Sequence, residues 1–154
     1  MSLSCGQEKI NISAGFGLPE LLNAGVRFHA NQTQIGFSVG SVPVSDEKNL
    51  SISGDIFYHF AGSSEYSNRR PWYFRAGLNY LRTETTREIE KYTFLNTRFG
   101  RDFNVSEKFG IGLDVGATFE LEKKEILKDN QTSSWFDLDF PVFPSLSLSV
   151  FYRI

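Results

Sequence analysis

A single cysteine, Cys5, stands near the start of the 154-residue sequence. One thiol has no partner within the chain, so an intramolecular disulfide is excluded as a source of stability. No apolar run approaches the roughly 18 residues that a transmembrane helix requires. This excludes a helical span but not a membrane β-barrel, because barrel strands need only alternate. The formal net charge of −2 lacks the basic footprint of a nucleic-acid-binding protein.

The composition instead favours β-structure, with 15 Phe, 6 Tyr and 13 Gly. Short turns and longer loops alternate between segments in which apolar and polar residues alternate. This arrangement predicts an all-β fold, an eight-stranded antiparallel up-and-down transmembrane barrel with a polar interior and an apolar exterior. The predicted strands are residues 10–17, 24–31, 33–42, 50–60, 72–83, 92–103, 109–121 and 145–154.

The two faces of these segments indicate which side points inward. In FGIGLDVGATFEL (109–121) every odd position is apolar, and the even positions carry glycine, threonine and acidic residues. Across all segments the polar face holds most of the glycines, no lysine, and arginines balanced by acids. Small residues and paired charges suit a narrow barrel interior. We therefore predict a structural, non-catalytic interior network of Arg27, Asp55, Arg75, Arg98, Asp102, Asp114, Glu120 and Arg153.

The alternative is a soluble, lipocalin-like barrel that holds a small apolar ligand. It would place glycine, serine and paired charges on the water-exposed side, where nothing explains them. The membrane barrel also predicts aromatic girdles at the two lipid boundaries. Strand direction puts Tyr58, Trp72 and Tyr152 near one edge and Tyr80 near the other.

From Ile10 to Ile154 the chain resembles the small outer-membrane barrels of the OmpA/OmpX type. The last strand, SLSLSVFYRI, is similar to the C-terminal signal read by the barrel-assembly machinery, although that family usually ends in an aromatic residue rather than Ile154. The resemblance implies a monomer in a bacterial outer membrane, with periplasmic termini and contacts to lipid and lipopolysaccharide. Residues 9–154 would form the single barrel domain. Residues 1–8 would be a signal-peptide remnant or a disordered start, with Cys5 left over from the signal or lipidated.

Side chains for catalysis are scarce. The inward-facing His29 and His59 lie near periplasmic strand ends, whereas lipid-modifying enzymes of this fold class act near the outer leaflet. We expect no enzyme activity, cofactor or metal site, with a lipid A-modifying enzyme as the alternative. The acidic residues Asp137 and Asp139, with Glu84, Glu88 and Glu90, either bind divalent cations that bridge lipopolysaccharide or form a solvated loop face.

An eight-stranded barrel is filled by its own side chains, so we expect no wide pore. Specificity would then reside in the long loops, residues 83–91 and 122–144. Alternation continues into both, which predicts a surface-exposed strand edge that docks a protein or glycan. The alternative is that these loops only shield the barrel. The predicted role is therefore structural or surface-binding.

Overall fold

The computed structural model describes residues 9–43, 45, 47–127, 132–133 and 142–154. Within these residues the regular structure consists of strands, and no helix occurs. Residues 1–8, predicted as a signal remnant or disordered start and containing Cys5, lie outside the described residues. The strands are β1 (Ile10–Gly17), β2 (Leu21–Ala30), β3 (Thr33–Ser41), β4 (Lys48–Ala61), β5 (Trp72–Glu84), β6 (Glu88–Asn104), β7 (Phe109–Leu127), β8 (Thr132–Ser133) and β9 (Val142–Arg153).

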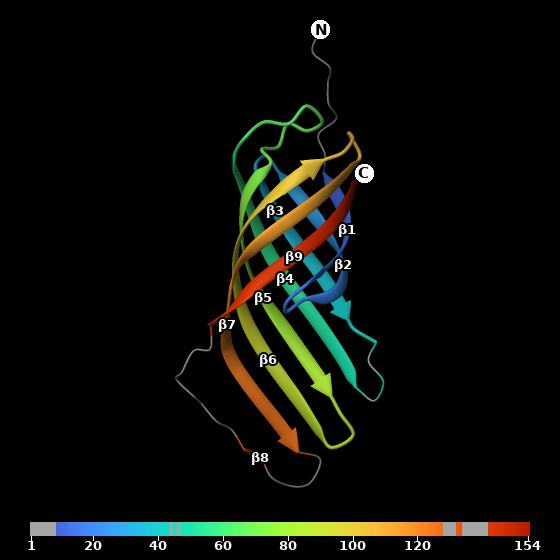
Figure 1. The fold of residues 1–154 in the computed structure, drawn as a ribbon, viewed down its shortest axis with the longest axis vertical. Helices are drawn as coiled ribbons and strands as arrows, with labels where there is room; N and C mark the ends of the chain where they lie inside the picture. Colours follow the sequence, from blue (N-terminus) through green and yellow to red (C-terminus); the bar gives the residue numbers. More distant parts are fainter. Residues whose placement is uncertain (1–8, 44, 46, 128–131, 134–141) are drawn as a thin grey trace.

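Eight of the strands close a barrel (Figure 1). From β1 to β7 each strand pairs antiparallel with the next, β7 pairs with β9, and β9 returns to β1. β8 pairs only with the edge of β7, through Glu125–Ser133 and Ile126–Thr132. The prediction of a closed, eight-stranded antiparallel up-and-down barrel is confirmed. β1 begins and β9 ends at the same end of the barrel, since Asn11 lies opposite Arg153.

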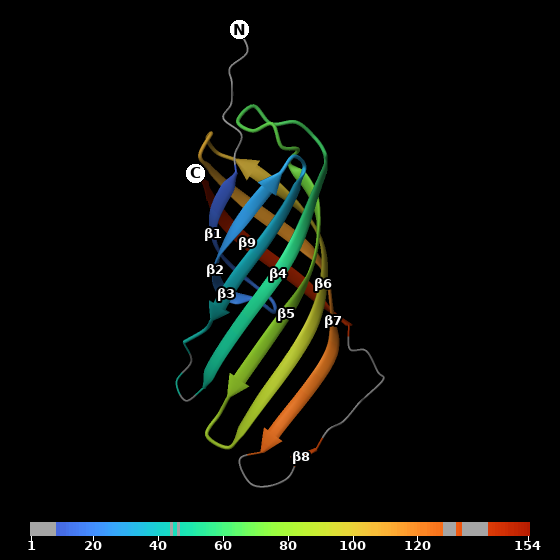
Figure 2. The same ribbon diagram turned by 180° about the vertical axis from the view of Figure 1, so that it is seen from behind.

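Several predicted strands are too short: β2, β4 and β9 begin two or three residues before the predicted positions, and β6 and β7 differ most. β6 begins at Glu88 rather than residue 92, and β7 ends at Leu127 rather than residue 121. Their ladder continues because the β5–β6 turn is tight, with Thr85 Oγ1 accepting a bond from the Glu88 amide at 3.2 Å. β6 and β7 extend furthest at the end away from the C-terminus (Figure 2).

Strand structure continues into both predicted loops, residues 83–91 and 122–144, as the alternation there predicted. In the first, only residues 85–87 form a turn, and the rest is strand. In the second, residues 122–127, 132–133 and 142–144 are strand. The other residues of that loop, including Asp137 and Asp139, lie outside the described part of the chain.

β9 shows the burial pattern of the barrel strands most clearly. Its inward positions, from Ser145 through Ser147, Ser149 and Phe151 to Arg153, are all buried. The intervening Leu146, Leu148, Val150 and Tyr152 are all exposed. Successive side chains leave opposite faces of a strand, so one face of β9 lines the inside and the other faces outward.

The same division runs around the barrel. The buried hydrophobic residues of the described chain are Phe57, Tyr73, Phe94 and Phe151, whereas the buried polar and charged residues are far more numerous. Outward-facing apolar side chains are widely exposed, as with Phe37 at 56% and Leu148 at 53%.

A substitution at Gly100 on β6 tests how tightly the barrel interior is filled. A Cβ atom added there would lie 2.5 Å from Cζ of Tyr73 and 2.6 Å from Cβ of Asp114. We expect Gly100→Ala to lower the free energy of unfolding by about 1–3 kcal/mol, because an overpacked interior must shift. The measurement is urea-induced unfolding of the refolded protein in detergent.

Gly54→Ala is the matched control for this substitution. The Cβ atom added at this outward-facing position would lie 3.7 Å from the Phe37 ring, an ordinary contact. We expect it to be neutral or to stabilise by about 0.4–1 kcal/mol, because alanine restricts the unfolded chain. Equal effects of the two substitutions would contradict a filled interior.

Candidate functional site

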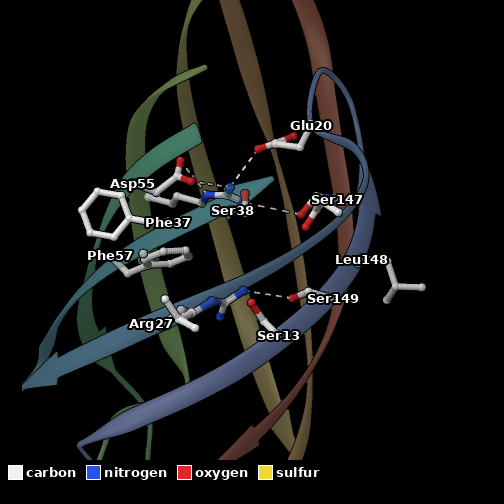
Figure 3. A pocket seen from close by; sticks show the side chains of 15 residues that line it. Ser13, Glu20, Arg27, Phe37, Ser38, Asp55, Phe57, Ser147, Leu148 and Ser149 are labelled. Carbon is white, nitrogen blue, oxygen red and sulfur yellow. Dashed lines mark hydrogen bonds and ion pairs between the residues drawn. The ribbon is translucent and has the colours of Figure 1, made fainter. Parts of the chain in front are cut away.

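Five side chains form an ion-pair cluster inside the barrel. Arg75 on β5 lies 2.8 Å from carboxylate oxygens of both Glu20 and Asp55, and 3.4 Å from Asp114. Arg98 on β6 lies 2.7 Å from Glu20 and 3.2 Å from Asp114. Figure 3 shows Glu20 and Asp55 approaching the same guanidinium group from different sides. Two cations therefore share three carboxylates.

The strand register explains why the cluster needs bridging acids. Arg75 and Arg98 are direct cross-strand partners on the inward face. Like charges in directly opposed positions are destabilising. Glu20 and Asp114 each contact both guanidinium groups and so offset the repulsion between the two positive charges. Because a buried charge requires a partner, each member of the cluster depends on the others.

Glu20 enters this cluster from the β1–β2 turn, not from a strand. The turn folds into the barrel end, so that Glu20 is only 2% exposed. Its backbone is held as well: the Leu18 carbonyl accepts hydrogen bonds from Arg98 Nη2 at 2.7 Å and from Ser145 Oγ at 2.6 Å. The turn thereby fills the interior at the end opposite the C-terminus.

Arg27 forms a separate layer next to the cluster. Its guanidinium lies 4.6 Å from the centroid of the Phe57 ring and 5.8 Å from that of Phe151, and it donates to Ser149 Oγ at 3.2 Å. Figure 3 shows Arg27 and Ser149 beside a small cavity. Its volume of about 20 Å³ has room for a single water molecule, not for a substrate.

A second cluster of polar side chains closes the barrel end nearer the C-terminus. Arg69, in the β4–β5 loop, is buried and lies 3.4 Å from Asp102 and 3.0 Å from Nδ1 of His29. The Nδ1 atom of His59 lies 2.6 Å from the carbonyl oxygen of Arg70. Both histidines are thus engaged by this loop, which folds over the strand ends.

The eight predicted network residues fall into three groups in the structure. Asp55, Arg75, Arg98 and Asp114 come together in the central cluster. The other three buried members are dispersed: Arg27 contacts Ser149, Asp102 pairs with Arg69, and Arg153 donates to the Ser106 and Glu107 carbonyls and to Asn104 Oδ1.

Glu120 is the exception, because it lies apart from the buried groups. It is partly exposed, and none of the ion pairs found among the described residues includes it. The physical reason is its height along the barrel: it lies opposite Phe94, beside a register shift, beyond the layer of arginines.

Sequence reasoning missed two partners in the interior, Glu20 and Arg69. Both belong to connecting segments, where alternation gives no inside or outside assignment. Charge counting gave no signal either, because the predicted inward face already matched four arginines with four acids.

The predicted boundary aromatics all lie on the outward face. Tyr58, Tyr80 and Tyr152 are exposed. Trp72 is partly covered, because Arg101 lies over its ring with its guanidinium carbon 5.1 Å from the ring centroid.

No cluster of three or more His, Cys, Asp or Glu side chains suited to a metal ion occurs among the described residues. The part of the chain that the structure describes also has no helix able to cross a bilayer. No protein-family model matches the sequence, and no curated protein matches it either.

Proposed function

We propose that this protein is a transmembrane β-barrel of a bacterial outer membrane, with a closed, salt-bridged interior and a structural or surface-binding role. The observation that carries the proposal is the outward face of the barrel. Large apolar side chains are exposed there on every strand of the closed barrel, for example Ile12, Phe37, Ile56, Leu78, Phe99, Leu113 and Leu148. Soluble monomers rarely expose continuous apolar patches beyond a few hundred Å².

The soluble lipocalin-like alternative conflicts with the buried residues. Such a barrel needs an apolar interior to hold its ligand. Here the inside holds paired arginines and carboxylates, and the cavity beside Arg27 has room for one water molecule. Lipid on the outside would stabilise the apolar band without further partners.

The resemblance to the OmpA/OmpX type also supports an orientation of the barrel in the membrane. The short β2–β3 and β6–β7 turns lie at the end where β1 begins and β9 ends, and the extended β6 and β7 strands lie at the other end (Figure 1). We propose that the first end is periplasmic and that the extended strands face outward. The protein would be a monomer that contacts lipid and lipopolysaccharide and is inserted by the barrel-assembly machinery through β9.

The interior groups support a non-conducting and non-catalytic barrel. Arg75, Arg98, Glu20 and Asp114 satisfy one another, and the segments bearing Glu20 and Arg69 fill the two barrel ends. A nucleophile or general base must reach a substrate, whereas these charges are buried in mutual contact.

Electrophoresis of unboiled samples tests the membrane proposal. We expect the protein, refolded into detergent micelles or phosphatidylcholine vesicles, to migrate differently before and after boiling, and to require detergent or lipid for solubility. Its compact barrel would resist unfolding by the gel detergent until heated. A chain that folds without amphiphile and shows no heat-dependent shift would contradict the proposal.

The part of β7 beyond its ladder with β9 supports the surface-binding role. β7 pairs with β9 only as far as Phe119 and with β8 only at Glu125 and Ile126. Between them, on the side away from β6, residues 120–124 have no strand partner among the described residues. We propose that the backbone groups of this segment pair with an added strand from a partner.

Shortening the β5–β6 extension tests this role, because residues 88–90 pair with residues 125–127 and so hold the projecting end of β7. Replacing residues 83–90 by Asn-Gly keeps Arg82 opposite Lys91 and closes the strands with a two-residue turn. We expect a several-fold loss of glycan-array binding and of self-aggregation by cells that display the protein, with the heat-dependent gel shift intact. Unchanged binding in the shortened variant would favour loops that only shield the barrel.

A further inference from the structure

Arg101 on β6 is a charged side chain in an apolar setting on the outside of the barrel. Its cross-strand partners are Trp72 and Leu113. Along β6 its neighbours on the same face are Phe99 and Phe103. A cation in this position stands apart from the buried network, because it lies on the opposite face of the strand from Arg98 and Asp102.

Aromatic rings hold the guanidinium group in place. Its central carbon lies 5.1 Å from the ring centroids of both Trp72 and Phe103. The Trp72 ring in turn lies 5.3 Å from that of Phe99, and Phe99 lies 5.5 Å from Phe60. We call Phe60, Trp72, Phe99 and Phe103 the aromatic patch. Cation–π contacts of this kind orient an arginine without neutralising it.

No carboxylate pairs with Arg101 among the residues that the structure describes. A second cation borders the aromatic patch, because Arg70 donates from Nη1 to the Phe60 carbonyl at 2.7 Å. The patch therefore has positive charge at two of its edges and no ion-paired acid at Arg101.

The aromatic patch lies at one end of the barrel. Trp72 is the first residue of β5, and β6 ends at Asn104, three residues after Arg101. This is the end at which β9 also finishes, the periplasmic end in the proposed orientation. Aromatic rings and arginines at this height meet the headgroup region of a bilayer.

We propose that Arg101, between the rings of Trp72 and Phe103, binds the phosphate of a glycerophospholipid in the periplasmic leaflet. The inference rests on the proposed membrane location. A guanidinium offers paired donors that match phosphate oxygens, and its charge is otherwise uncompensated. The aromatic patch supplies apolar surface for the glycerol and upper acyl chain of the same lipid. Free phosphate has neither group and would not contact the patch.

Native mass spectrometry of the refolded full chain in detergent tests the site. Phosphatidylglycerol and the phosphate-free lipid diacylglycerol are titrated against the wild type, Arg101→Gln and Lys108→Gln. Lys108 is an exposed cation in the β6–β7 turn at the same end, so its substitution is a matched loss of charge. We expect Arg101→Gln to weaken phosphatidylglycerol binding about five-fold, the equivalent of roughly 1 kcal/mol for one cation near the headgroups.

The control lipids and variants define the other expected results. Diacylglycerol should bind the wild type and Arg101→Gln equally, and Lys108→Gln should retain phosphatidylglycerol as the wild type does. Arg101→Lys should recover only part of the affinity, since an ammonium lacks the planar fork. Equimolar inorganic phosphate should not displace the lipid.

Three results would overturn the site: identical lipid binding by the wild type and Arg101→Gln, displacement by inorganic phosphate, or an Arg101-dependent dimer in place of bound lipid. These are distinct from failure of the proposed function. A chain with the heat-dependent gel shift but no effect of Arg101→Gln loses only the phosphate site, whereas a chain without the shift loses the membrane location.

Discussion

Replacing Arg98 by methionine is expected to lower the free energy of unfolding by about 3–5 kcal/mol. Arg98 is 1% exposed and contacts Glu20, Asp114 and the Leu18 carbonyl. Methionine retains much of the volume of the side chain but no donor or charge. Three buried carboxylates would then share Arg75, and a buried charge without its partner costs more than the pair contributes.

Arg82→Met is the control for the loss of an arginine. Arg82 forms a 3.2 Å ion pair with Glu84, but its side chain is 43% exposed. Exposed ion pairs contribute about 0–1 kcal/mol, so this variant should unfold almost as the wild type does. Both values come from urea titrations in detergent, followed by the fraction of heat-shifted protein on gels.

A double substitution separates charge from packing. Glu20→Gln combined with Arg98→Met removes one of the three carboxylates that Arg75 would otherwise balance alone. Its destabilisation should therefore be less than the sum for the two single variants, because residues of one ion-pair network are not additive. A loss below about 1 kcal/mol for Arg98→Met would contradict a buried network in which each member is required.

The parts of the fold that could be predicted are those governed by strand periodicity. β9 alternates without a fault from Ser145 to Arg153, and the structure places one set inside and the other outside. The predicted strand ends at residues 92 and 121 fall short of the observed ends of β6 and β7, because most residues beyond them are charged although the alternation continues. Beyond Thr93 and Glu122 the ladder continues through charged pairs such as Lys91 and Lys124.

The site was less predictable because tertiary folding of the connections supplies part of it. Arg75, Arg98, Asp55 and Asp114 lie on strands, so their inward direction follows from position. Glu20 and Arg69 lie in connecting segments, and their burial depends on where the chain turns back into the barrel. Glu120 has the inward parity but lies too far along β7 to meet an arginine of the cluster. Strand periodicity therefore predicts whether a side chain points inward, but not how far along the barrel it lies.

Leu148→Arg is expected to discriminate most directly between lipid and water outside the barrel. Leu148 lies in the middle of β9, opposite Phe16 on one side and Leu113 on the other, and is 53% exposed. In the proposed orientation this position lies near the bilayer midplane, where an arginine on the lipid-facing side costs about 2–4 kcal/mol. On a water-exposed surface the same change falls within about 0.5 kcal/mol.

Ile10→Arg provides the depth control. Ile10 is the first residue of β1, at the barrel end, where an arginine on the lipid-facing side costs only about 0–1 kcal/mol. The comparison uses urea unfolding in phosphatidylcholine vesicles, so that assembly in the cell does not enter the result. A large loss for Leu148→Arg with a small loss for Ile10→Arg requires a low-dielectric slab around the barrel, since both substitutions add the same charge to an exposed apolar site. Equal and small losses would place both residues in water and would remove the membrane proposal together with the phosphate site at Arg101.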